Sequence, residues 1–182
     1  MRSEKKVIAL CGFMFCGKTE TAGLISAMTG LAFCDTDELI EAEAGLRVFE
    51  IFEKYGESGF RELESRTLAD FLAKAENAVV SLGGGCAADL NNLGLLSRKT
   101  FLVYLRASFD EIKRRIGEAP ETELKSRPLA ASRDLTALKK LYDSRLEYYE
   151  TAELIIDCDG LNPAETAEKT IEALKLKKVI KR

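Results

Sequence analysis

The sequence predicts a three-layer α/β fold in which a five-stranded parallel sheet is covered by helices on both faces. Short apolar runs alternate with longer amphipathic segments along the chain, an order typical of βαβ units. A glycine-containing loop joins the first apolar run to the first amphipathic segment, as in strand–loop–helix units that bind phosphate. We expect one domain across the 182 residues, with ligands beyond the carboxyl ends of the strands.

The predicted strands are short runs of apolar, β-branched or aromatic residues, which suit a sheet buried on its faces. In chain order they are Lys6–Cys11, Leu31–Asp35, Ala78–Leu82, Thr100–Arg106 and Leu154–Cys158. The predicted helices have apolar residues three or four positions apart, with Asp and Ser at suitable N-cap positions. In chain order they are Lys18–Met28, Thr36–Ala44, Val48–Tyr55, Gly59–Ala75, Ala88–Leu96, Phe109–Ile116, Leu135–Tyr149 and Pro163–Leu174.

The loop after the first strand has the composition of a phosphate-binding loop. It reads Gly12-Phe13-Met14-Phe15-Cys16-Gly17-Lys18-Thr19. Its glycines let backbone N–H groups point at phosphate oxygens, Lys18 adds a cation, and the Thr19 hydroxyl can hold Mg²⁺. The loop therefore predicts binding of a nucleoside triphosphate, and the alternative is a plain turn with a solvated lysine.

The amino-acid composition argues against several other classes of function and site. Apolar residues make up 46% and charged residues 31%, and the net charge of −3 argues against broad binding to nucleic acid or membrane surfaces. With no secretory or membrane-spanning pattern, we expect a cytoplasmic protein. Five cysteines without a C-x-x-C pair, and no histidine, make zinc sites and disulfides unexpected. A general base must then be a carboxylate, or a lysine, cysteine or tyrosine with a shifted pKa.

Cys16 is a separate hypothesis within the phosphate loop. A thiol among backbone N–H groups and a lysine can have a lowered pKa and react with thiol reagents. The other cysteines are expected to act mostly as small buried apolar residues.

Two aspartates stand where the second predicted strand ends, beside the phosphate loop. Asp35 and Asp37 are two positions apart, so both carboxylates should project to one side. Phosphoryl transfer needs one acid to organise the Mg²⁺ shell and another to orient, or deprotonate, the attacking hydroxyl. The alternative is that both only cap a helix.

A second group of residues suits a carboxylate-bearing substrate. Arg61 and Glu64 are three apart on a helical stretch, so the carboxylate can hold the guanidinium in place. Gly83-Gly84-Gly85 directly follows the third strand, which suggests backbone that a ligand approaches closely. The alternatives are a weak surface ion pair and a flexible turn.

Residues Gly117–Arg133 are too polar and too long for a simple connection and predict a mobile lid, a disordered surface loop being the alternative. Arg127 in this segment could neutralise charge on a transferring phosphoryl group, and Arg145 follows on the next helix. Either could be a plain surface arginine. The basic tail Lys175–Arg182 is expected to be the solvated end of the last helix.

Taken together these motifs resemble the shikimate kinase family from about Val7 to Pro163. The matching residues are G-x-x-x-x-G-K-T at Gly12, D-T-D at Asp35, F-R-E-L-E at Phe60, G-G-G at Gly83, R-P-L at Arg127, and Arg145 with Tyr148 and Ala152. The resemblance implies a nucleoside monophosphate kinase-like P-loop fold, with an acceptor-binding helical region at about 36–64 and a lid at about 117–133. It implies transfer of the ATP γ-phosphoryl group to the 3-hydroxyl of shikimate, a step of aromatic amino acid biosynthesis, by a monomer without nucleic-acid or membrane partners.

The resemblance also assigns roles to individual residues. Asp37 would contact the substrate hydroxyls, Arg61 and Arg145 the substrate carboxylate, and Glu64 would support Arg61. Lys18 and Arg127 would stabilise phosphate charge, Thr19 would bind Mg²⁺, and Asp35 would act through the metal's water shell. The remaining implied contacts are Gly83, Gly84 and Gly85 in the substrate pocket; Gly12, Phe13, Met14, Phe15, Cys16, Gly17 and Glu20 at the nucleotide; and Ile156 through Pro163 beside adenine.

Four positions differ from the family pattern. Phe15 and Cys16 replace the usual glycine and alanine, and Glu20 replaces a second hydroxyl residue. Phe15 can point away from the phosphates if its φ is negative, and Glu20 avoids repelling them if it faces solvent. Arg145 lies one residue closer to Ala152 than is typical.

Two other functions stay open at this point. A related kinase such as a gluconate kinase would share the nucleotide half, although Arg61 and the three glycines weigh against it. A catalytically silent binding domain is disfavoured because Lys18, Asp37 and Arg127 are all present. A GTPase switch is disfavoured because no Asn-Lys-x-Asp signature occurs.

Overall fold

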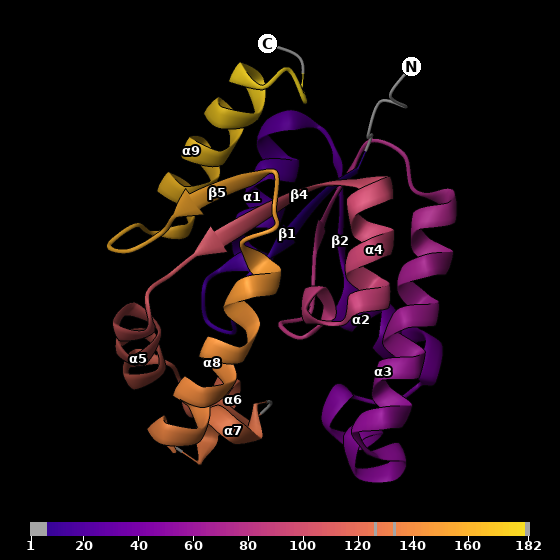
Figure 1. Ribbon diagram of the computed structural model, residues 1–182, viewed down its shortest axis with the longest axis vertical. Coiled ribbons are helices and arrows are strands. Elements are labelled where there is room, and N and C mark those ends of the chain that lie inside the picture. Colours follow the sequence, from indigo (N-terminus) through magenta and orange to yellow (C-terminus); the bar gives the residue numbers. More distant parts are fainter. Residues whose placement is uncertain (1–6, 126, 133, 181–182) are drawn as a thin grey trace.

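A twisted parallel sheet forms the centre of the protein. The computed structural model describes residues 7–125, 127–132 and 134–180. Five strands are arranged in the order β2-β3-β1-β4-β5, and every neighbouring pair is parallel (Figure 1). Their bounds are β1 Val7–Cys11, β2 Ala32–Asp35, β3 Ala78–Ser81, β4 Thr100–Arg106 and β5 Leu154–Asp157. The fold class predicted from the sequence is confirmed.

Helices cover both faces of this sheet. Their bounds are α1 Lys18–Thr29, α2 Thr36–Ala44, α3 Val48–Lys74, α4 Leu90–Lys99, α5 Phe109–Glu118, α6 Glu121–Lys125, α7 Pro128–Ala131, α8 Leu135–Tyr149 and α9 Pro163–Leu176, with a 3₁₀ turn, η1, at Cys86–Ala88. Helices α1 and α9 pack against each other on one face, and α3, α4 and α8 cover the other (Figure 1). The described helices are not long and apolar enough to cross a membrane.

The central strands are buried because helices lie on both of their faces. All residues of β1 and β3 are buried, whereas the edge strand β2 has exposed positions. Buried parallel strands are expected to read as continuous apolar runs, which is why the sequence pattern located them to within a residue or two at either end. The core therefore fixes the carboxyl ends of β1, β2 and β3 side by side.

Side-chain caps set most helix starts near the predicted positions. Asp35, Ser108 and Asp134 accept hydrogen bonds from first-turn N–H groups of α2, α5 and α8. Asn162 and Glu165 form a capping box on α9, with Pro163 as its first residue. Helices α2 and α8 have the predicted bounds.

The structure differs from some predicted boundaries and agrees with others. The predicted helices Val48–Tyr55 and Gly59–Ala75 both lie in α3, where a kink at Gly56, with a non-helical φ of 69° and ψ of −177°, separates them as the prediction had it. The segment predicted as Ala88–Leu96 is the turn η1 followed by α4, because Asp89 caps the helix through Asn91 and Asn92. The segment Gly117–Arg133, for which no helix was predicted, contains α6 and α7, and its role as a lid stays a prediction. Residues 6, 126, 133, 181 and 182 of the predicted segments lie outside the described residues.

Candidate active site

The loop between β1 and α1 is held in a tight conformation at its first residue. Gly12 has a φ of 145°, and a Cβ atom there would lie 2.7 Å from the Leu105 carbonyl oxygen. A side chain cannot fit this close approach of the loop to β4. Gly17, with a φ of 92°, directly precedes the first turn of α1. The loop thus leads into a helix N-terminus, which attracts anions.

Lys18 is the first residue of α1, directly after this loop. Its Nζ donates hydrogen bonds to the carbonyl oxygens of Gly12 at 2.9 Å and Phe13 at 3.0 Å, and contacts Cys16 Sγ at 3.7 Å. Only 8% of Lys18 is exposed. A cation is therefore concentrated at the loop, where a polyphosphate would bind. Cys16 itself is buried, and its predicted thiol reactivity stays a prediction.

Thr19 and Asp35 form a small oxygen-rich cluster next to Lys18. Thr19 Oγ1 donates to Asp35 Oδ2 at 2.8 Å and lies 3.1 Å from Ser81 Oγ. The other oxygen of Asp35, Oδ1, accepts the N–H of Asp37 at 2.9 Å. Asp35 therefore caps α2 with one oxygen and accepts from Thr19 with the other, and its role at Mg²⁺ stays a prediction. Hydroxyl and carboxylate oxygens are the donors that Mg²⁺ prefers.

Asp37 lies in the first turn of α2, beside the end of β3. A Cβ atom on Gly83 would lie 2.7 Å from Asp37 Oδ1 and 3.1 Å from Glu64 Oε1, so only glycine fits between the two carboxylates. Burial, and secondarily the neighbouring Asp35 carboxylate, raise the Asp37 pKa to about 6, although Lys18 and Arg127 act in the opposite direction. Asp37 is thus a partly buried carboxylate whose pKa is raised toward neutral pH.

Arg61 is held by acidic side chains of its own helix. Its Nη1 donates to Glu64 Oε2 at 2.7 Å, and Nη2 lies 3.6 Å from Glu57 Oε1. Glu64 is 1% exposed, and burial raises its pKa despite the neighbouring guanidinium. The side chain of Arg61 is 26% exposed, so one buried carboxylate positions a guanidinium that a ligand can reach.

The three glycines after β3 pack closely against functional side chains. A Cβ atom on Gly85 would collide with the Arg61 guanidinium. The Gly84 carbonyl oxygen accepts hydrogen bonds from Arg145 Nη1 at 3.1 Å and from the Tyr149 hydroxyl. Held from both α3 and α8, this segment matches the prediction of a close-approach site better than that of a flexible turn.

Arg127, between α6 and α7, lies against the phosphate loop. Arg127 Nη1 donates to Glu123 Oε1 at 2.8 Å, and its Cζ lies 4.4 Å from the centroid of the Phe15 ring. Phe15 has a φ of 61°, so a negative φ does not turn its side chain away from the loop mouth. Glu20 is exposed, as a carboxylate beside phosphates would need to be.

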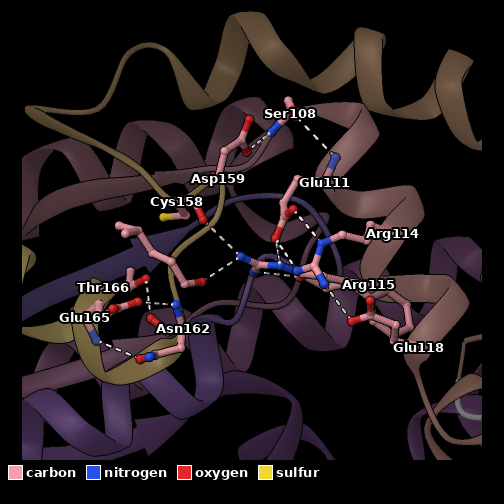
Figure 2. Close-up of polar contacts among 12 residues, drawn as sticks. Ser108, Glu111, Arg114, Arg115, Glu118, Cys158, Asp159, Asn162, Glu165 and Thr166 are labelled. Carbon is pink, nitrogen blue, oxygen red and sulfur yellow. Dashed lines mark hydrogen bonds and ion pairs between the residues drawn. The ribbon is translucent and has the colours of Figure 1, made fainter.

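Arg115 connects the phosphate loop to the segment after β5. Figure 2 shows its hydrogen bond to the Cys158 carbonyl oxygen in that segment. Its Nη1 donates to the Phe15 carbonyl oxygen at 3.2 Å, and its Nη2 to those of Cys158 at 3.0 Å and Leu161 at 3.2 Å. Glu111 orients it through Nε at 2.7 Å. Hydrogen bonding to Arg114 and then to Arg115 lowers the Glu111 pKa to about 2.

Sequence reasoning missed three of these residues. Arg115 carried the signal of a Glu at i−4, but its distant contacts were not visible. Ser81 and Tyr149 are an ordinary strand serine and helix tyrosine until the fold brings them to Thr19 and Gly84.

Fold and site together define a P-loop kinase of the nucleoside monophosphate kinase-like class, an ATP-dependent enzyme. The family model described as shikimate kinase matches residues 14–175 of the chain. The chain therefore belongs to the shikimate kinase family.

Individual relatives agree with this assignment. The chain is 35% identical over 167 residues to the shikimate kinase of Thermodesulfovibrio yellowstonii, covering 92% of this chain and 94% of the relative. It is 37% identical over 174 residues to that of Moorella thermoacetica, covering 92% and 94%. Among solved structures, shikimate kinase from Acinetobacter baumannii in complex with shikimate superposes with a TM-score of 0.85 at 28% identity, covering 94% of each chain.

Proposed function

We propose that this protein transfers the γ-phosphoryl group of ATP to the 3-hydroxyl of shikimate, giving shikimate 3-phosphate and ADP. The observation that carries the proposal is the position of Gly83. It packs against both Asp37, which suits a hydroxyl, and Glu64, which holds the carboxylate-binding Arg61. A hydroxy acid bound there would meet a base and a guanidinium beside the phosphate loop.

The nucleotide half of the site is formed by residues Gly12 through Glu20. The loop N–H groups would hold the phosphates, and Lys18 would exchange its bonds to loop carbonyls for bonds to phosphate oxygens. Arg127 is close enough to add positive charge from the lid side. Arg115 and the segment from Cys158 to Pro163 would lie beside the base.

The cluster of Thr19, Asp35 and Ser81 fits Mg²⁺. It offers hydroxyls and one carboxylate, a hard-oxygen donor set, with Asp35 placed to act through bound water. When bound, the ion would neutralise charge on the β- and γ-phosphates.

The acceptor half would use Asp37 to orient the 3-hydroxyl and receive its proton. A base with a pKa of about 6 is mostly ionised at neutral pH and is matched to that task. Arg61 and Arg145 would hold the substrate carboxylate, Glu64 would keep Arg61 in place, and Gly83, Gly84 and Gly85 would line the pocket. The hydroxyl oxygen then bonds to the γ-phosphorus, the bond to the β–γ bridging oxygen breaks, and ADP leaves with that electron pair.

We further propose the arrangement of the whole domain. Residues 36–64 would bind the acceptor, residues 117–133 would form the lid, and the protein would act as a cytoplasmic monomer without nucleic-acid or membrane partners. A gluconate kinase or a silent binding domain is disfavoured because Arg61, Glu64 and the three glycines form one packed group next to Asp37.

A coupled assay of ADP release tests the proposal directly. The purified protein receives ATP and Mg²⁺ with shikimate, quinate or gluconate as separate acceptors, and phosphorus NMR identifies the product. We expect shikimate-dependent release and a phosphomonoester at the 3-position. ADP release with gluconate but not with shikimate would overturn the assignment of shikimate as the acceptor. Tight ATP binding without any phosphoryl transfer would indicate a catalytically silent domain.

A further inference from the structure

Phe15 adopts a backbone conformation that is unusual for its side chain. Its φ of 61° is in the left-handed region, which costs energy for a bulky residue. The shikimate kinase pattern usually has glycine at this position, and glycine adopts this conformation easily. A strained aromatic residue in a phosphate loop persists when surrounding contacts hold it, and such strain is concentrated at functional sites.

Two arginines hold Phe15, one through its backbone and one through its ring. The carbonyl oxygen accepts a hydrogen bond from Arg115 Nη1 at 3.2 Å, and Glu111 in turn fixes Arg115. The ring faces the Arg127 guanidinium, whose Cζ lies 4.4 Å from the ring centroid. This separation is well within the range of a cation–π interaction, and Phe15 is only 9% exposed, which strengthens the attraction.

The two contacts of Arg127 have different consequences. Glu123 lies one helical turn earlier in the same segment, so this pair, with both side chains well exposed, moves with the lid. The Phe15 ring belongs to the phosphate loop and is fixed to the sheet through β1. Only a contact of this second kind can keep the guanidinium near the place where the γ-phosphate would bind.

We propose that Phe15 is a positioning residue for the lid arginine. Its ring keeps Arg127 over the phosphate loop before nucleotide binds, so the guanidinium needs a short displacement to reach the transferring phosphoryl group. An arginine that is already ordered loses less conformational freedom when it engages phosphate. This inference rests on the role proposed above for Arg127 in phosphoryl transfer.

Hydrogen exchange tests the positioning without any enzymatic activity. Phe15→Leu removes the aromatic face but keeps an apolar side chain with the same backbone strain, and Phe15→Tyr keeps the ring. In the nucleotide-free protein we expect Phe15→Leu to raise amide exchange of residues 121–132 about three- to tenfold, the factor that corresponds to a modest cation–π interaction. Phe15→Tyr should exchange like the wild type, and Arg127→Ala should loosen the same residues. Equal exchange in all variants would overturn the proposal.

Steady-state kinetics then tests the consequence for the reaction. Phe15→Leu should lower kcat about three- to tenfold and leave the KM for shikimate unchanged. Phe15→Tyr, which keeps the ring, should have the kcat of the wild type. In an Arg127→Ala background, Phe15→Leu should have no further effect on kcat, because the ring acts through that arginine. Additive losses would show that Phe15 acts only on the loop. If Phe15→Leu does not fold, Phe15→Met replaces it. If the protein phosphorylates none of the acceptors, hydrogen exchange still tests whether Phe15 positions Arg127.

Discussion

Asp37 combines partial burial with proximity to opposite charges, as the general base proposed for this site would need. Its carboxylate touches Gly83, while Lys18 and Arg127 lower its pKa from the value that burial and Asp35 would set. Asp35, two residues earlier, is tied to Thr19 and to the start of α2. Neighbouring carboxylates with different partners can therefore take different roles.

If Asp37 is the base that we propose, replacing it should remove turnover without removing nucleotide binding. We expect Asp37→Asn to lower kcat by about 10²-fold or more, because the amide cannot receive the hydroxyl proton. The dissociation constant for ATP, measured by calorimetry, should stay within about twofold of the wild type. Near-normal turnover of Asp37→Asn would exclude Asp37 from the chemistry.

The raised pKa of Asp37 also has a consequence for stability. The native carboxyl titrates at about 6 and the unfolded one near 3.8, so between these values the native state binds more protons. The free energy of unfolding should therefore fall as pH rises from about 4 to 6 through this group, by about 1–3 kcal/mol. Asp37→Asn should lack this component. Urea unfolding of both proteins across that range measures the difference, and parallel curves would contradict the raised pKa.

Arg61 should determine acceptor affinity through its planar fork. Arg61→Lys keeps the charge next to Glu64 but loses bidentate geometry, so we expect the KM for shikimate to rise about tenfold or more. The KM for ATP should not change, since the role that we propose for Arg61 is to bind the acceptor. An equal rise in both constants would indicate a general disturbance of the site instead.

At the scale of elements, the sequence predicted those features that depend on local pattern. The strands were found because buried parallel strands are continuously apolar, and α2 and α8 because Asp35 and Asp134 cap them. Contacts between distant elements could not be predicted in this way. The bond between Arg115 and the Phe15 carbonyl spans 100 residues, and the φ of Phe15 depends on such contacts.

The turn after β3 packs closely against the middle of α3, because a Cβ atom on Gly85 would collide with the Arg61 guanidinium. Gly85→Ala would place a methyl group against that guanidinium and displace it. We expect the KM for shikimate to rise about tenfold or more with a smaller change in the KM for ATP. Gly23→Ala on α1 is the matched control, because among the described residues a Cβ there meets nothing within 4 Å. Equal effects of both changes would show that the close approach at Gly85 has no role.

At the scale of the whole molecule, the candidate site combines residues at the strand ends, which the sheet holds in place, with Arg127, which does not belong to the sheet. The phosphate loop follows β1, Asp35 is the last residue of β2, and the three glycines lie just after β3, so the strand ladders fix their relative positions. Arg127 instead belongs to the segment of α6 and α7, which contacts α8 (Figure 1). Closure of this segment over bound substrates would exclude water from the γ-phosphoryl group.

Limited proteolysis within residues 117–133 measures that closure. These residues include an exposed ion pair between Glu123 and Arg127, a kind of contact that contributes little stability. We expect the cleavage rate to fall about tenfold or more when shikimate and a non-hydrolysable ATP analogue are both present, because Arg127 would then bind phosphate and the open form would be depopulated. Either ligand alone should slow cleavage less, since the segment would then close over only one of the two molecules that it is expected to cover. Cleavage elsewhere in the chain serves as the internal control, and an unchanged rate at 117–133 with both ligands bound would mean that this segment does not close.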